Sequence, residues 1–127
     1  MNSDFIEDHE LLYRAVPKFP KFWKNDNKSV SSALFKNCNG VSVDRDGKRT
    51  EDNICSLLQK RIANSIAVAK LIASEARQVD VYLHPKPSKS NHFHAEIHES
   101  RNHILISNSK AKKLSNLVKL IWFKVAT

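Results

Sequence analysis

The sequence has 127 residues, of which 41% are hydrophobic and 27% charged, a composition that indicates one soluble globular domain and excludes a disordered or fibrous chain. Lys and Arg number 21 and Asp and Glu 13, a net charge of +8 that favours polyanionic partners such as RNA, DNA or a phosphorylated nucleotide. No apolar run is long enough to span a membrane, and the N-terminal segment MNSDFIEDHE is acidic, so we expect a single cytosolic domain over residues 1–127 without a membrane anchor.

The N-terminal part predicts two short strands separated by an irregular loop. The segment ELLYRAV, residues 10–16, alternates weakly and ends at a proline, which is typical of a short strand. Two prolines exclude a regular helix over residues 17–29. The aromatic residues of this loop either pin it to the core or, with its lysines, stack bases and follow a phosphate backbone. A turn at Asn39-Gly40 precedes the strand candidate VSV, residues 41–43.

Helical spacing of apolar residues begins after Thr50 and predicts a helix over residues 51–63. A single helix running on to Arg77 would be long for a domain of this size, so we predict a break near Asn64-Ser65, a strand after it, and a short helix at SEAR. At the C-terminus, residues 109–123 predict an amphipathic helix whose polar face is basic.

Three further strands are predicted between these helices. They cover VDVYLH at residues 79–84, NHFHAEIH at residues 91–98 and HILIS at residues 103–107. The fold class that follows is α+β, a small antiparallel or mixed sheet with the 51–63 helix and the basic C-terminal helix packed on one face.

The segment 91–98 divides into two faces if it is a strand, because successive side chains point to opposite sides. Phe93, Ala95 and Ile97 then face the core. The other face is titratable along its whole length and carries His92, His94, Glu96 and His98.

Five of the six histidines lie between His84 and His103, and neighbouring strands would bring them toward one patch. General acid–base chemistry on a phosphodiester, a zinc, manganese or iron site using Glu96, and added positive charge for an anion are the functional alternatives. An exposed strand face without any chemistry is the fourth alternative. The spacing matches neither a cupin nor an HExxH protease, so we predict no metal and no cofactor.

Two other function classes are excluded by motif. The two glycines are isolated and cannot form a phosphate-cradling loop, which excludes a Walker-type nucleotidase. Cys38 and Cys55 lack metal-ligand spacing and are predicted to be free thiols rather than a disulfide.

Candidate site residues also come from upstream of the histidines. Arg14 could clamp a phosphate through two hydrogen bonds or serve only the structure. The predicted catalytic residues are His94, His92, Glu96 and Arg14, and the predicted substrate-binding residues are His84, His98, Tyr13, Ser31, Ser32 and Arg45.

The elements LLYRAV, SSALF, GVSVDR, HPKP and NHFHAEI, in this order, resemble a group of small uncharacterised bacterial proteins over roughly residues 11–115. The resemblance implies that His94-Ala95 is the histidine step of the group, and it implies no activity. The arginine on the first strand and the Ser-Ser element are also similar to the NAD-binding core of ADP-ribosyltransferases, which would make Glu96 or Glu99 the catalytic glutamate.

The sequence therefore predicts a protein that acts on RNA or a nucleotide phosphate, as an RNase, phosphodiesterase or toxin-like effector, through its histidine-rich strand. A non-catalytic module that binds nucleic acid or a protein partner is the alternative, and an ADP-ribosyltransferase-like protein that uses NAD is a third. A protein partner or a homo-oligomer is left open.

Overall fold

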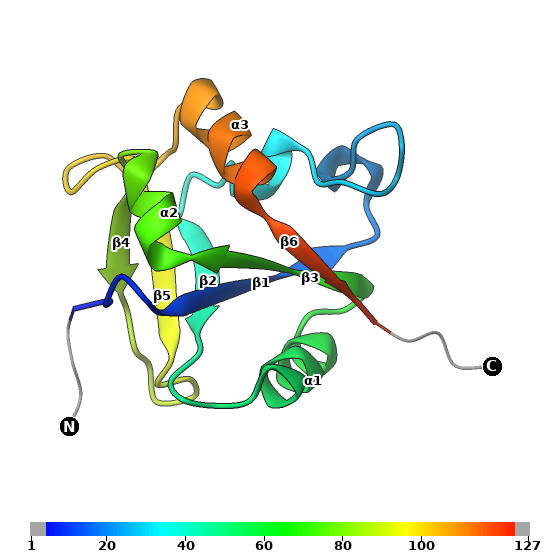
Figure 1. The fold of residues 1–127 in the computed structure, drawn as a ribbon, viewed down its shortest axis with the longest axis horizontal. Helices are drawn as coiled ribbons and strands as arrows, with labels where there is room; N and C mark the ends of the chain where they lie inside the picture. Colours follow the sequence, from blue (N-terminus) through cyan, green and yellow to red (C-terminus); the bar gives the residue numbers. More distant parts are fainter. Residues whose placement is uncertain (1–4, 124–127) are drawn as a thin grey trace.

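Six antiparallel strands form one sheet in the computed structural model, which describes residues 5–123 (Figure 1). The strand order is β4-β5-β2-β1-β3-β6, and the predicted α+β class is confirmed. The ends of the predicted domain, residues 1–4 and 124–127, lie outside the described residues. The strands are β1 (Leu11–Pro17), β2 (Val41–Arg45), β3 (Ser65–Ile72), β4 (Tyr82–Pro85), β5 (His94–His98) and β6 (Lys119–Trp122).

Three α-helices and two 3-10 turns complete the fold. The helices are α1 (Glu51–Arg61), α2 (Ala73–Gln78) and α3 (Asn108–Leu117), and the 3-10 turns are η1 (Pro20–Phe22) and η2 (Ser32–Phe35). In the part of the chain from residue 5 to 123, no helix has both the length and the apolar character needed to cross a bilayer.

The sheet is covered on both faces. As a consequence, β1 is buried at successive positions rather than at alternate ones. Leu12 and Val16 join the larger core with α2, α3 and η2 on one face. Tyr13 and Ala15 join a smaller core with α1 on the other face. Figure 1 shows α1 below the sheet and α2 and α3 above it. The central helix and the C-terminal helix thus cover opposite faces and not the same face.

The predicted start of α1 and the predicted break near Asn64-Ser65 are confirmed, whereas the helix ends at Arg61 and not at residue 63. The hydroxyl of Thr50 accepts a hydrogen bond from the backbone N–H of Asn53 (3.2 Å) and caps the first turn. The helix ends at Arg61, where Ile62 turns to an extended conformation, and Asn64 with its positive φ of 64° forms the turn before the next strand. β3 begins at the next residue, and α2 follows it as the predicted short helix.

Two C-terminal predictions are wrong in detail. The predicted helix over residues 109–123 ends at Leu117, and after Val118 the residues Lys119–Trp122 form the edge strand β6, which pairs with β3. The segment 103–107 is not a strand. Its burial does not alternate either, since Ile106 is buried in the larger core while both Ile104 and Leu105 are exposed. Its neighbourhood contains only an isolated bridge between Ser100 and His103 within the described residues.

Two aromatic residues of the 17–29 loop, Phe22 and Trp23, anchor the loop to the core. Anchoring was one of the two alternatives predicted for this loop. Trp23 is buried, and its indole N–H donates to the carbonyl of Pro17 (2.9 Å). Its ring stacks on Trp122 with centroids 5.1 Å apart. Phe22 packs against the larger core, whereas Phe19 is exposed.

Candidate functional site

A cavity of about 660 Å³ opens where β1 and β2 separate. Among the described residues these strands pair at two positions, Leu12 with Arg45 and Tyr13 with Asp44. Beyond that point β1 continues along β3, while β2 continues along β5. The volume falls in the range of small-molecule sites, roughly 300–1,000 Å³.

The cavity combines an apolar wall with several cationic and polar groups. The apolar wall comes from the end of β1, from η1 and from the end of α1 with the residue after it, and it includes Ala15, Pro17, Phe22, Leu58 and Ile62. The polar lining includes Arg14, Ser42, Arg61, Lys86, Asn91 and His94. Such a lining suits a ligand that has an anionic group and a larger apolar part.

Arg14 crosses the gap between the two strands. Its Nε donates to the carbonyl of Leu34 (3.0 Å) and its Nη1 to the carbonyl of Ser42 (2.8 Å). In this way the guanidinium replaces the main-chain donors that the separated strand no longer supplies.

The charge of Arg14 is not neutralised by any described residue, since it forms no ion pair there. Burial lowers the pKa of Arg14 to about 10. Its Nη2 makes no hydrogen bond to a described residue, and in this part of the chain no fully buried side-chain polar atom lacks a partner. The Nη2 group is therefore accessible, and an anion in the cavity would relieve the cost of its desolvation.

His94 lines the same cavity from the start of β5. Its Nδ1 lies 3.0 Å from the backbone carbonyl of Lys86. Because a carbonyl only accepts hydrogen bonds, Nδ1 carries the proton, and Nε2 of the neutral ring keeps its lone pair. The side chain is thus arranged to accept a proton at Nε2.

Asp44 connects several residues on the polar side of the cavity, and the residue is only 3% exposed. Its carboxylate accepts from Asn91 (2.9 Å) and pairs with Arg49 (3.2 Å) and Arg61 (3.3 Å). Sequence analysis did not identify this network. The available signal was an acidic residue directly after the apolar VSV run, because a carboxylate buried in a strand requires partners.

Tyr13 also lines the cavity, but its hydroxyl is already engaged. It donates to Glu51 (3.1 Å), which pairs in turn with Lys70 (2.9 Å). Burial, together with the hydrogen bond to Glu51, raises the pKa of Tyr13. This arrangement makes Tyr13 a structural member of the wall.

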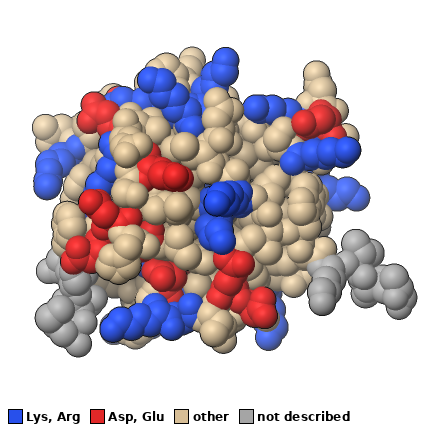
Figure 2. Space-filling view, viewed as in Figure 1, with Lys and Arg blue, Asp and Glu red and all other residues tan. Residues whose placement is uncertain are grey.

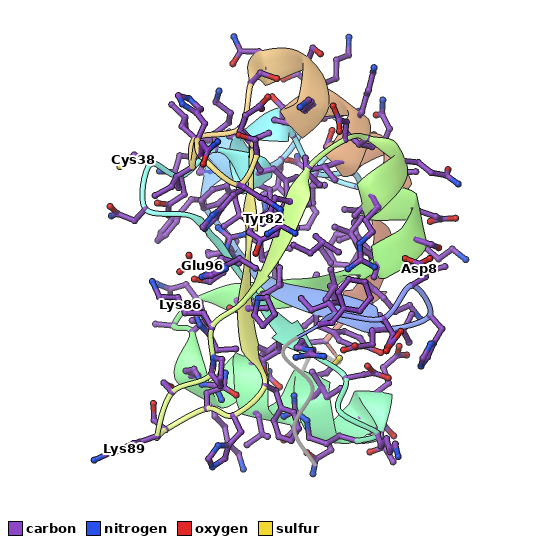
Figure 3. All side chains as sticks on the ribbon, turned by 90° about the vertical axis from the view of Figure 1, so that its left-hand side faces the viewer. Asp8, Cys38, Tyr82, Lys86, Lys89 and Glu96 are labelled. Atoms are coloured by element: carbon purple, nitrogen blue, oxygen red, sulfur yellow. The ribbon has the colours of Figure 1, made fainter. Side chains whose placement is uncertain are left out.

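Glu96 and His98 form a separate buried pair on the β4–β5 side of the sheet. The Nε2 of His98 donates to Glu96 Oε1 (2.8 Å), and the Lys86 ammonium lies 3.4 Å from Glu96 Oε2. Burial acts to raise the pKa of Glu96, but the hydrogen bond from His98 and the charge of Lys86 hold it below its usual value. The His84 ring lies 5.2 Å from the ring of His98. Figure 3 shows Glu96 and Lys86 on the same side of the molecule.

Gly40 packs directly against the Glu96–His98 pair. It has a φ of +99°, and an added Cβ would lie 2.6 Å from Glu96 Oε1 and 3.1 Å from His98 Nε2. We expect Gly40→Ala to lower the free energy of unfolding by about 2 kcal/mol, through backbone strain and displacement of the buried carboxylate. Urea denaturation measures this loss. Asn39→Ala, at an exposed position of the same turn, should change it by less than about 0.5 kcal/mol, and equal effects would contradict the explanation.

The remaining predicted site residues lie outside the cavity lining. His92 is exposed in a turn before β5, so it does not share the strand face of His94. Asn91 causes this turn, because its side-chain oxygen accepts from the N–H of Phe93 (3.0 Å). The prediction that Phe93 faces the core is therefore wrong. Its ring packs against the Arg49 guanidinium, whose central carbon lies 3.8 Å from the ring centre.

Three upstream candidates lie outside the cavity lining, and two of them have structural partners. The hydroxyl of Ser31 caps η2 by accepting from the N–H of Ala33 (3.3 Å), and Ser32 is the first residue of that turn. Arg45 forms two hydrogen bonds of 2.7 Å with Glu10. The cavity thus brings together Tyr13, Arg14 and His94 from the predicted set.

Thiols and metal ligands do not add a second site in the described part of the chain. Cys38 is exposed, Cys55 is buried, and both are free, as predicted. No group of three or more His, Cys, Asp or Glu side chains between residues 5 and 123 is placed to hold a metal ion.

The positive charge of the protein is distributed rather than gathered on α3. In Figure 2, acidic side chains are interspersed with Lys and Arg across the visible face. Lys110 of α3 pairs with Glu99 (2.8 Å) and lies 3.7 Å from Asp80. Lys112 and Lys113 remain exposed on this helix.

Comparisons with protein-family models, with curated proteins and with solved structures gave no match to this chain. The geometry of the cavity is therefore the basis on which a function is inferred.

Proposed function

We propose that this protein binds the phosphate of a nucleotide or of RNA in the cavity between β1 and β2 and acts on it by proton transfer. The observation that carries the proposal is the pair of groups in one cavity. Arg14 offers a desolvated guanidinium without an acidic partner among the described residues, and His94 offers an imidazole nitrogen with its lone pair free.

Each side chain has a separate task in this scheme. The Nη2 of Arg14 donates to a phosphate oxygen and stabilises the charge that develops on it. The Nε2 of His94 takes a proton from the attacking hydroxyl or water, the new P–O bond forms as the bond to the leaving oxygen breaks, and the leaving oxygen takes up a proton from the protonated His94 or from water. Arg61 and Lys86 add positive charge at the lining, and Asp44 keeps Arg61 and Asn91 in place.

The apolar wall favours a nucleotide over inorganic phosphate. Phe22, Leu58 and Ile62 offer a surface for a base or sugar, and the cavity volume suits a ligand of that size. The NAD-using alternative receives no support from the placement of the glutamates. Glu96 pairs with His98, Glu99 pairs with Lys110, and neither lines the cavity.

The proposal predicts that Arg14→Met weakens the binding of uridine monophosphate roughly 10- to 100-fold, because a hydrogen bond to a charged group is worth about 1.5–3 kcal/mol. Isothermal titration calorimetry at fixed salt measures this loss. Arg14→Lys keeps the charge without the fork of donors, so it should bind with intermediate affinity. Stability should change little, because the loss of two hydrogen bonds is offset by removal of a desolvated charge.

Lys112→Met provides the matched control, because it removes one exposed cation from α3 at a distance in sequence from the cavity lining. It should change the affinity by less than about twofold. If Arg14→Met and Lys112→Met weaken binding equally, the protein attracts the nucleotide by its net charge and not through the cavity.

A further inference from the structure

Two exposed aromatic side chains flank the end of β1 at which the cavity opens. Phe19 and Trp122 are each 47% exposed. The ring of Phe19 lies 6.3 Å from that of Phe22, which lines the cavity. Exposed aromatic rings that lie next to a cavity are typical of a binding surface.

The second ring is connected to the same end of β1. Trp122 stacks on Trp23 with an interplanar angle of 22°, and Trp23 donates its indole N–H to Pro17. Pro17 in turn lines the cavity. The stack holds Trp122 at the edge of the sheet with one face of its ring covered by Trp23 and with half of the residue still exposed.

The loop that carries Phe19 and Trp23 is strongly basic. Lys18, Lys21, Lys24 and Lys28 form no ion pair with a described residue. The carboxylate of Asp26, the one acidic residue of the loop, is occupied by Ser29 and by the N–H of Lys28. The Lys21 ammonium lies 5.0 Å from the centre of the Phe22 ring. Unpaired lysines thus alternate with aromatic rings along the segment.

We propose that this aromatic and basic surface, formed by the 18–28 loop and Trp122, binds a single-stranded polynucleotide that continues out of the cavity. The inference rests on the proposed function and deepens it, because it names a polymer rather than a mononucleotide as the substrate class. Unpaired bases stack on Phe19 and Trp122, and the lysines follow the phosphates. A duplex is not accommodated in this way, because its bases already stack on one another.

Base stacking on an aromatic side chain typically changes affinity by roughly 5- to 150-fold per ring. We therefore expect Phe19→Ala and Trp122→Ala each to weaken the binding of a fluorescein-labelled ten-nucleotide oligouridine by about fivefold or more. Fluorescence anisotropy gives these affinities. Uridine monophosphate, which reaches only the cavity, should bind both variants as tightly as the unmodified protein. A ten-nucleotide oligothymidine distinguishes RNA from DNA as the source of the strand.

A second readout reports stacking directly. Binding of oligouridine should quench the tryptophan fluorescence of the full chain, and Trp122→Ala should remove most of that quenching. Thermal unfolding of each variant shows whether the fold is retained. Phe19→Ala removes a side chain that is exposed and lies outside both cores, so it keeps the test informative if Trp122→Ala disturbs the edge strand.

Two controls test whether binding depends on this surface or only on the net charge of the protein and on any exposed apolar side chain. Leu105→Ala removes an exposed apolar side chain elsewhere and should leave oligouridine binding unchanged. Lys21→Ala/Lys24→Ala should weaken binding more than Lys112→Ala/Lys113→Ala, although each pair removes the same charge.

Equal effects of the two lysine pairs, or unchanged affinity in both aromatic variants, would overturn the inference. A concentration-dependent dimer in sedimentation velocity that Trp122→Ala dissolves, with no oligouridine binding, would assign the surface to a second copy and also overturn it. If oligouridine binding needs Phe19 and Trp122 but uridine monophosphate does not bind, the polynucleotide surface is supported and the cavity assignment fails.

Discussion

His94→Ala is expected to lower the rate of phosphodiester cleavage about 10²- to 10⁴-fold, the usual contribution of one general acid or base. Nucleotide affinity should change by less than about threefold, because in the proposed site Arg14, and not the imidazole, would hold the phosphate. The substrates to compare are RNA, cyclic nucleotides and NAD, with turnover and binding measured separately. A selective fall in turnover follows only if His94 Nε2 moves a proton at the reacting phosphate.

His92→Ala is the matched control for this prediction. His92 lies two residues earlier in the chain, is exposed, and does not line the cavity, so its loss should leave turnover unchanged. Equal losses in the two variants would contradict the assignment of His94. If the unmodified protein turns over none of these substrates and its salt-dependent binding survives His94→Ala, the protein is a binding module and not an enzyme.

Asp44→Asn is expected to lower the free energy of unfolding by about 3 kcal/mol, since breaking a buried ion pair costs about 3–5 kcal/mol and one partner here is partly exposed. The change removes the charge that Arg49 and Arg61 share and replaces one of the two accepting oxygens by an NH2 group, which can only donate. Thermal unfolding should then occur roughly 10 °C lower. Nucleotide affinity should also fall, because Asn91 and Arg61 lose the group that positions them at the cavity.

The control for Asp44 is a carboxylate that carries no such network. Asp52 is exposed in the first turn of α1, so Asp52→Asn should cost less than about 1 kcal/mol, through the helix dipole alone. A loss for Asp44→Asn no larger than that for Asp52→Asn would show that the buried network contributes no more than a surface ion pair.

Local periodicity was sufficient to predict most elements of this fold, because the signals lie within short segments. The apolar spacing of α1, the Asn64-Ser65 pair that follows it and the proline at the end of β1 each act over a few residues. The segment after Leu117 was misassigned because its apolar residues fit both a helical and a two-residue period. Pairing with β3, which is distant in sequence, decides in favour of a strand there.

The cavity could not be predicted from the sequence, because it depends on the order of the strands. β2 lies between β5 and β1, and only this arrangement brings His94 near the gap that Arg14 crosses. The histidine pattern predicted a face shared by four residues, whereas the turn at Asn91 removes His92 from that face and the pair with Glu96 occupies His98. Residue type was enough to select Arg14 and His94 as candidates. It could not show that both line the same cavity.

The junction of β1 and β2, with its two paired positions, divides the sheet into two three-stranded halves. One half, β4-β5-β2, carries His94, and the other, β1-β3-β6, carries Arg14. The two halves are joined across the gap by the Arg14 hydrogen bond to Ser42 and by the larger core, which contains residues of both. A ligand that contacts both sides of the gap would add a further connection between the halves and would stabilise the folded state.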